Sequence, residues 1–219
     1  MLAACAPAQS TEPDSDFQIW NETTFSFPVL KSKDKKDKEF DRLSLLVFGV
    51  LRLGQNRLYP ADVRIGAGFD YKINRFVSFT PTYLYRRGEA IRNQKEYEHR
   101  IRFDVTVGYK WKHFSIKDRN RVEYRARNSR NNSVRYRNKF TFAFPVNVNG
   151  EEIFSPFVSE EPYYDFEAKS WTTNEITAGI TRKLSKIATA DIFYVRRDIR
   201  NGQIRFFNGV GVNLKFRID

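Results

Sequence analysis

Three consecutive runs between Tyr97 and Phe144 alternate apolar and polar residues with a period of two. In each run, the residues of one parity are mainly aliphatic or aromatic, and those of the other parity are mostly arginine and lysine. Because successive side chains of a strand point to opposite faces, each run predicts a strand with one apolar and one charged face. A soluble sheet would bury the apolar face, whereas in a bilayer that face contacts lipid and the charged face lines a lumen. The pattern therefore predicts the wall of a membrane β-barrel.

Similar runs occur along most of the chain and are separated by turn signals. Their approximate limits are 16–27, 42–53, 62–73, 76–86, 96–111, 114–127, 133–145, 152–158, 171–182, 187–199 and 204–217. Eleven runs are recognisable, but single-chain bacterial barrels usually have an even number of strands. We therefore expect an all-β, antiparallel up-and-down transmembrane β-barrel of 12 strands, with 10 as the alternative. The weakest stretch is 151–170, where Pro156 and Pro162 interrupt the alternation and residues 160–170 resemble a long loop.

The length of 219 residues fits a single barrel domain, which we place at residues 16–219. Residues 1–15 resemble the end of an export signal, because Ala6-Pro7-Ala8 has the small-x-small form of a signal-peptidase site. The segment from Leu2 to Cys5 also resembles a bacterial lipobox, so whether Cys5 is lipidated or removed stays open. Together with the barrel pattern, these features predict a location in the outer membrane of a Gram-negative envelope.

The composition narrows the class of protein. Mean hydropathy is −0.60 and no stretch approaches the roughly 18–20 apolar residues of a spanning helix, which excludes a helical membrane protein. The net charge of +12 would suggest nucleic-acid binding if the basic residues shared an exposed face. Here they alternate with apolar residues, so we expect no nucleic-acid partner. One cysteine and two histidines give no reason to expect a metal site or another cofactor.

The inward positions of the three central strands carry ten bases and three acids. The basic track comprises Arg100, Arg102, Lys117, Arg119, Arg121, Arg125, Arg127, Arg135, Arg137 and Lys139, and the acids are Glu98, Asp104 and Glu123. In a narrow lumen, this excess of positive charge would attract small anionic solutes that carry carboxylate, phosphate or sulfate. Alternatively, these acids pair with the arginines across the lumen and close it, together with Glu175, Asp191 and others, since long side chains fill much of a small barrel.

Aromatic residues near the strand ends predict the girdles that lie at the two membrane interfaces. They are Tyr71, Tyr83, Tyr109, Trp111, Phe114, Tyr124 and Tyr136. In the last strand, Gly211, Leu214 and Phe216 resemble the G-x-x-Φ-x-Φ ending that the outer-membrane insertion machinery reads, although three residues follow Phe216. The expected partners are therefore membrane lipid and that machinery, and the oligomeric state stays open.

No enzymatic activity is expected. A lipid hydrolase at the barrel rim would need a serine beside a histidine that acts as general base. The available combinations are His99 with Ser44, Ser78 or Ser133, and His113 with Ser115. Both histidines fit an interface role better, because they lie near aromatic residues at strand ends. A soluble lipocalin-like carrier is a further alternative and would need the apolar face inside.

Two residues conflict with a lipid-facing wall, since Asp118 and Asn120 have the outward parity of the run 114–127. An acid near the membrane midplane would cost on the order of 2 kcal/mol or somewhat less. A bulge near Lys117 would turn Asp118 inward. Alternatively, Asn120 bonds Asn138 of the next strand and marks a protein contact on the outer wall, through which the chain could form oligomers.

Three segments resemble domain-of-unknown-function family 2490: Phe17-Gln18-Ile19-Trp20-Asn21-Glu22, Gly68-Phe69-Asp70-Tyr71-Lys72-Ile73-Asn74 and Arg119-Asn120-Arg121-Val122-Glu123-Tyr124-Arg125. The resemblance covers most of 17–216. It implies a small bacterial outer-membrane β-barrel without an assigned activity and gives no catalytic residues. Two functions then remain open: a narrow anion-selective pore with an arginine-lined lumen, and a closed structural or interaction barrel in an envelope complex.

Overall fold

The computed structural model describes residues 15–34, 37, 39–56, 58–129, 131–149, 151–200 and 204–219. The expected export-signal segment, with Cys5, lies outside the described residues apart from Ser15, which begins the first strand. Within the described ranges, no helix is long and apolar enough to cross a membrane.

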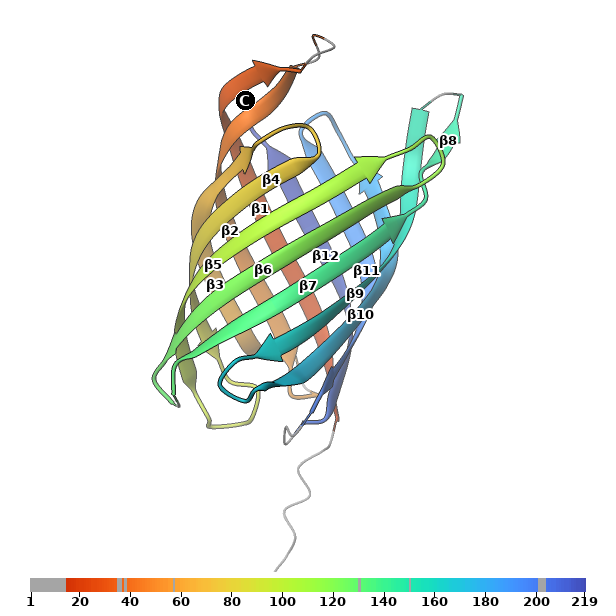
Figure 1. Cartoon of the computed structure of the whole chain (residues 1–219). Helices are drawn as coiled ribbons and strands as arrows, with labels where there is room; N and C mark the ends of the chain where they lie inside the picture. The colour runs from red at the N-terminus through yellow and green to blue at the C-terminus, as the bar shows by residue number, and fades with distance from the viewer. Residues whose placement is uncertain are drawn as a thin grey trace, which may run out of the picture.

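The described structure consists of strands and their connections (Figure 1). The strands are β1 (Ser15–Lys33), β2 (Glu39–Gly54), β3 (Tyr59–Lys72), β4 (Val77–Gly88), β5 (Glu96–Lys110), β6 (Ser115–Arg127), β7 (Ser133–Ala143), β8 (Val146–Val148), β9 (Glu151–Asp165), β10 (Ser170–Lys183), β11 (Ala188–Ile199) and β12 (Phe206–Arg217). Their alternating inward and outward residues follow the period of two that defines the runs in the sequence.

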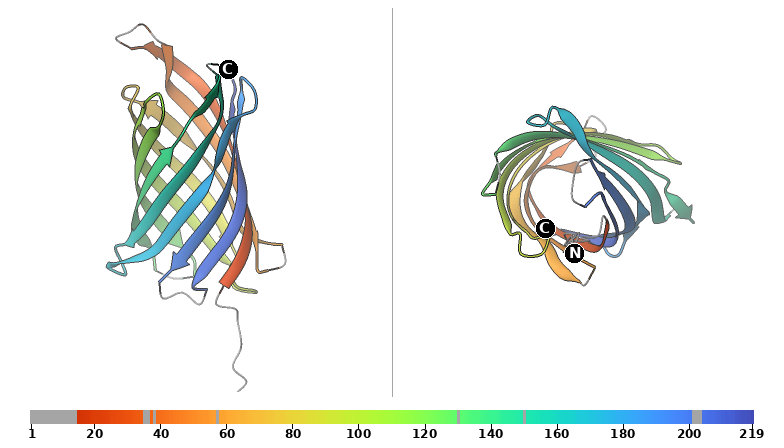
Figure 2. Two further views of the ribbon diagram at one scale, coloured as in Figure 1. Left: turned by 90° about the vertical axis from the view of Figure 1, so that its right-hand side faces the viewer. Right: turned by 90° about the horizontal axis from the view of Figure 1, so that it is seen from below.

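Eleven of the twelve strands close into a barrel (Figure 2). Antiparallel pairing runs from β1 to β7, passes to β9, and continues to β12. A parallel pairing of β1 with β12 completes the ring, from Ser15 opposite Phe206 to Ser26 opposite Arg217. The three-residue β8 pairs with β9 at the rim. The expected β-barrel is confirmed, but the seam is parallel rather than antiparallel, because an odd number of wall strands leaves the first and last running in the same direction.

The connections gather at two opposite ends of the barrel (Figure 1). We call the end with the β1–β2, β3–β4, β5–β6 and β10–β11 connections the turn end, where the C-terminus also lies. The opposite end, with the β2–β3, β4–β5, β6–β7 and β9–β10 connections, is the loop end. At the turn end, Arg75 Nη1 lies 2.5 Å from Asp34 Oδ2, so the β3–β4 turn and the β1–β2 connection meet there.

Strand β9 corrects the expectation of a long loop over 160–170. It runs from Glu151 to Asp165, and only residues 166–169 connect it to β10. Pro156 lies opposite Ile180 and Pro162 opposite Asn174 in the ladder with β10. Each proline removes one N–H donor, whereas an open loop inside a bilayer would leave many more backbone groups without partners. The strand therefore continues through both prolines.

The apolar face of the wall points outward and the charged face points inward. On β5, Phe103 is 47% exposed whereas its neighbour Arg102 is 9% exposed, and on β6 the values are 43% for Val122 and 8% for Arg121. Since the outside of the barrel is the apolar side, this arrangement is the one that suits a bilayer and is the reverse of a lipocalin-like interior.

Candidate functional site in the lumen

The predicted basic track lines the inside of the barrel. Five of its arginines are at most 9% exposed: Arg100, Arg102, Arg121, Arg125 and Arg137. Arg119, Arg127, Arg135 and Lys139 are partly buried, and Lys117, at an inward position of β6, is more exposed. The three predicted acids, Glu98, Asp104 and Glu123, are also buried. These residues therefore share one lumen rather than a solvent-facing surface.

Glu98 on β5 is a first centre of ion pairing and is fully buried. Its Oε2 accepts from Arg100 Nε at 2.6 Å, and its Oε1 accepts from Arg125 Nη2 at 2.6 Å. Arg86 Nη1 on β4 reaches the same Oε1 at 3.2 Å and also bonds Glu96 at 2.6 Å. One carboxylate thus holds three guanidinium groups from three adjacent strands.

Glu123 and Glu161 form the second and third centres. Glu123 on β6 accepts from Arg135 Nε at 2.7 Å, and Arg137 Nη1 lies 3.7 Å from its other oxygen. Glu161 on β9 accepts from Arg119 Nη2 at 2.6 Å and from Arg137 Nε at 2.8 Å. Because Arg137 contacts both carboxylates, the two centres are joined, and we call the groups around Glu98, Glu123 and Glu161 the ion-pair network.

Further pairs extend this pattern to other strands. Arg121 binds Asp104 through two hydrogen bonds of 2.7 and 2.6 Å, a fork-like geometry that a lysine could not reproduce. On β3, Asp62 accepts from Arg64 and from Arg86. On the C-terminal strands, Glu175 of β10 binds Arg197 of β11. The same carboxylate accepts a hydrogen bond from the hydroxyl of Tyr163 at 2.9 Å.

Five of these groups are not among the residues predicted from the sequence: Asp62, Arg86, Glu161, Tyr163 and Arg197. A signal for most of them was present, since they lie at inward positions of runs with the same period of two as the central strands. Glu161 and Tyr163 were missed for a different reason, because they fall in the stretch that the prolines made resemble a loop. The partners of a given acid could not be read from the alternation, which reports only the face.

Apolar side chains fill the lumen beside the ion pairs. Trp20, Phe193 and Val195 form one buried cluster, and Phe48, Val50 and Leu84 form another. Two arginines stack on these clusters: Arg52 lies 3.5 Å from the ring centroid of Trp20, and Arg102 lies 4.8 Å from that of Phe48. Such cation–π contacts hold arginines without a carboxylate. Every wall strand thus contributes buried side chains to the lumen.

Positive charge without a matching acid collects toward the turn end. The charged groups near Lys117 are Lys215, Arg119, Lys139 and Asp70. Lys215 is held by Asp191 at 2.7 Å, whereas in the described part of the chain neither Lys117 nor Lys139 has an ion-pair partner. This part of the lumen can attract an anion, because its cations are in excess and partly accessible.

The predicted girdle residues lie on the outer wall or at the turns. Tyr109, Trp111 and Phe114 stack in series at the turn end, with centroid distances of 4.4 and 4.5 Å. Toward the loop end, the hydroxyl of Tyr83 lies 2.7 Å from Nδ1 of His99, which packs between tyrosine rings. Tyr71 receives hydrogen bonds from Arg42, and Tyr124 receives one from Asn132.

In the part of the chain that the structure describes, no hydrogen bond joins a histidine to a serine. The described contacts of His99 are with Tyr83 and Tyr85 on the outer wall, whereas Ser44 and Ser133 are buried at inward positions. His113 lies in the turn between Trp111 and Phe114. Among the described residues, no three His, Cys, Asp or Glu side chains gather as a metal ion would require.

The last strand carries the residues of the expected insertion signal. Gly211 lies opposite Trp20 across the parallel seam, and an added Cβ there would approach the ring of Phe193 to 2.4 Å. Leu214 has the outward parity of β12, and Phe216 stacks on Phe25 at 5.2 Å. In this strand, glycine therefore has a packing role that is independent of any recognition by insertion machinery.

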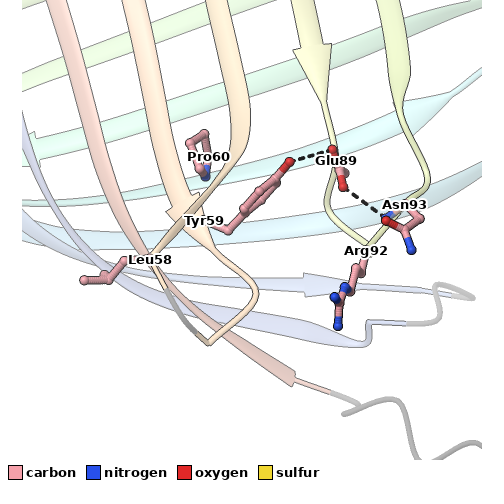
Figure 3. A pocket seen from close by; sticks show the side chains of 6 residues that line it. All are labelled: Leu58, Tyr59, Pro60, Glu89, Arg92 and Asn93. Carbon is pink, nitrogen blue, oxygen red and sulfur yellow. Dashed lines mark hydrogen bonds between the residues drawn. The ribbon is translucent and has the colours of Figure 1, made fainter.

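A shallow pocket of about 520 Å³ lies at the loop end (Figure 3). Leu58, Tyr59, Pro60, Glu89, Arg92 and Asn93 line it. Glu89 accepts from the backbone N–H of Asn93 at 3.0 Å and from the Tyr59 hydroxyl at 2.9 Å. The Asn93 bond, followed by the Tyr59 bond, lowers the pKa of the Glu89 carboxyl from its ordinary value. The acid thus fastens the β4–β5 connection to the neighbouring strand.

The outer wall contradicts the proposed bulge near Lys117. The β6 ladders with β5 and β7 continue through residues 117–119 without a register shift, so Asp118 stays on the outward face. The alternative hydrogen bond is present, since Asn138 Nδ2 donates to Asn120 Oδ1 at 3.1 Å. These groups satisfy one another, which removes the need for a bulge.

Three solved structures are similar in overall architecture. LpxR from Salmonella typhimurium is 9% identical, with 77% of this chain and 81% of that chain covered and a TM-score of 0.48. The NanC porin is 11% identical, with 90% and 98% covered and a TM-score of 0.49. An anion-selective porin from Comamonas acidovorans is 12% identical, with 78% and 52% covered and a TM-score of 0.41. None of these similarities assigns a function to this chain.

A comparison with curated protein sequences found no match. A family model described as "Protein of unknown function (DUF2490)" matches residues 17–215, which is nearly the whole barrel. The match confirms the resemblance drawn from the Phe17, Gly68 and Arg119 segments, and we conclude that this chain belongs to the DUF2490 family.

Proposed function

We propose that this protein is a bacterial outer-membrane β-barrel whose lumen is closed in its loop-end half, and that it acts as an interaction component of the envelope rather than as an open pore. One observation supports closure most strongly. The carboxylates Glu98, Glu123 and Glu161 are 0–2% exposed and are held by arginines from β4, β5, β6 and β7. A continuous water column would leave such carboxylates hydrated.

Barrel size supports the same proposal. A lumen bounded by about eight strands is just wide enough for side chains to fill it, and lumen width grows with strand number. With eleven wall strands, long arginine side chains and the two apolar clusters can together fill one section of the lumen. No catalytic role is part of the proposal.

Planar-bilayer recording tests closure directly. The purified chain should give no steady ohmic conductance, because ions would have to cross a layer of paired and desolvated groups. A double variant, Glu98→Gln with Glu123→Gln, should raise the frequency of current events, since two centres of the network lose their negative charge. A large, steady conductance of the unaltered chain would contradict closure.

Membrane placement has its own test. A fluorescent label at Phe103 should be quenched by a quencher confined to lipid tails, and a label at the neighbouring Arg102 should not. The two positions are adjacent in sequence and differ only in the face of β5 that they occupy. Equal quenching at both positions, or strong quenching at Arg102 alone, would contradict a lipid-facing apolar wall.

Anion passage is the second candidate, and the excess of lysine toward the turn end favours it. If a conductance is found, it should prefer anions, and Lys117→Gln with Lys139→Gln should weaken that preference. These lysines are better test positions than Arg121 or Arg137, because replacing either arginine would also release Asp104 or Glu161. A cation preference would exclude this candidate.

A further inference from the structure

Two carboxylates lie on the outward, apolar face of the barrel. Asp118 on β6 lies between Val107 of β5 and Phe140 of β7, whose side chains are 46% and 47% exposed. Glu160 on β9 lies between Phe140 and Ile176, which is 46% exposed. Both acids therefore share the outer wall formed by β6, β7, β9 and β10, with apolar residues around them.

Both acids lie at the depth of the hydrocarbon rather than at an interface. On β6, Asp118 is four residues from Phe114 at one end and six from Tyr124 at the other. At about 3.3 Å per residue, these separations are roughly 13 and 20 Å along the strand. Glu160 is likewise four residues from Tyr164. Because strands of such barrels tilt by about 35–45°, these separations correspond to depths of roughly 10 and 15 Å, which places both carboxylates below the headgroups.

The hydrogen bonds to these carboxylates come from neutral groups. Asn138 Nδ2 donates to Asp118 Oδ1 at 2.6 Å, and Asn120 Nδ2 donates to Asp118 Oδ2 at 2.9 Å. Asn174 Nδ2 donates to Glu160 Oε1 at 3.0 Å. In the described residues, no lysine, arginine or histidine forms an ion pair with Asp118 or Glu160. The amides orient the two acids but leave their charge uncompensated.

A second copy of the chain could not supply the missing charge from its own wall. Within the described strands, the outward arginines lie toward strand ends, namely Arg42, Arg87, Arg182 and Arg196, and Arg196 already binds Asp198. A symmetric contact through this wall would therefore bring acids together and leave them unpaired. Charges inside a membrane are instead paired with one another or with a specific partner group.

We propose that the wall formed by β6, β7, β9 and β10 docks a membrane-embedded segment of another protein that presents a lysine or arginine side chain to Asp118 and Glu160. The apolar residues around the acids supply packing, and the amides hold the carboxylates in place for a charge-assisted contact. The inference rests on the membrane placement in the proposed function and does not depend on whether the lumen is closed.

A defined peptide tests the docking surface. The reconstituted full chain, in phosphatidylcholine vesicles, is mixed with a single-span Leu/Ala helix carrying one central Lys, or with the same helix carrying Leu there. Energy transfer between labels on chain and peptide measures association. The Lys peptide should bind at least about tenfold more tightly than the Leu peptide, since only it can pair with the acids.

The variants isolate the two carboxylates. Asp118→Asn with Glu160→Gln should lower binding of the Lys peptide to the level of the Leu peptide. Asp198→Asn is the matched control, because Asp198 is an outward carboxylate that Arg196 already neutralises, and it should leave binding unchanged. Each single variant should give an intermediate loss, which keeps the test informative if the double variant does not insert.

Equal binding of the two peptides would overturn the proposal. So would self-association of labelled chain that disappears in Asp118→Asn, since it would assign the wall to a second copy. The lipid-quenching measurement at Phe103, made in the same vesicles, distinguishes failure of the docking surface from failure of the membrane placement. Quenching without discrimination between the peptides rejects the docking surface alone, whereas loss of quenching rejects the membrane placement on which it depends.

Discussion

Replacing Glu98 by Gln should be among the most destabilising single changes in this protein. The variant keeps the shape of the side chain and removes one buried negative charge. Arg86 would still bind Asp62 and Glu96, but Arg100 and Arg125 bond no other carboxylate in the described part of the chain. Two guanidinium groups, both under 10% exposed, would thus lose their direct counter-charge.

The magnitude follows from the distances. At an effective dielectric constant of 20, a unit pair at 4 Å is worth about 4 kcal/mol, so two lost pairs set an upper limit near 8 kcal/mol. Hydrogen bonds to the Gln carbonyl and the nearby Glu123 offset part of this loss. Breaking a buried pair by removing one partner typically costs about 3–5 kcal/mol, and we expect a loss of unfolding free energy in that range.

Urea unfolding in lipid vesicles, followed by tryptophan fluorescence and by the heat-modifiable mobility of folded barrels on gels, measures the effect. With a slope of about 2 kcal/mol per M, the midpoint should fall by roughly 2 M. Asp198→Asn is the control, since its pair with Arg196 is about half exposed and such pairs contribute about 0–1 kcal/mol. Equal midpoint shifts in the two variants would refute the assignment of stability to the ion-pair network.

Two further predictions concern packing and pH. Gly68→Ala should destabilise the barrel by about 1–3 kcal/mol in the same urea assay, because an added Cβ would lie 2.3 Å from a carbonyl oxygen of the next strand. Gly49→Ala, whose Cβ would meet its nearest atom at 3.9 Å, should be tolerated. The contacts of Glu89 with Asn93 and Tyr59 should be complete above its ordinary pKa of 4.5 and be lost as pH falls through its lowered pKa. The protection factor for hydrogen exchange of the Asn93 amide should then fall at low pH, and Glu89→Gln should abolish this pH dependence.

The face of each strand could be predicted from the sequence because it is a local property. Side-chain direction alternates along any strand, so the parity of Arg121 and Val122 is fixed once the segment is a strand. Only a bilayer makes an outward apolar face favourable, and the abundance of inward arginine excludes the mainly apolar interior of a lipocalin-like carrier. Fold class, sidedness and the lumen position of the basic track follow from these two facts.

The pairing inside the lumen was decided by the tertiary structure. The partner of Arg137 is Glu161, which lies 24 residues away on a strand that two prolines had made resemble a loop. The number of wall strands and the parallel β1–β12 seam depend on how the whole sheet closes, and no local pattern encodes closure. Asp118 is a second example. Its outward position could be read from the sequence, whereas its amide partners and the lack of a nearby cation could be read only from the structure.

The alternation along the chain is thus enough to predict a barrel wall and to say which residues face lipid or lumen, because the period of two acts residue by residue. Which charges neutralise one another is a property of the folded barrel, because it depends on distances between strands far apart in the chain. The ion-pair network, the lysine excess toward the turn end and the two unpaired carboxylates on the outer wall are all consequences of those distances.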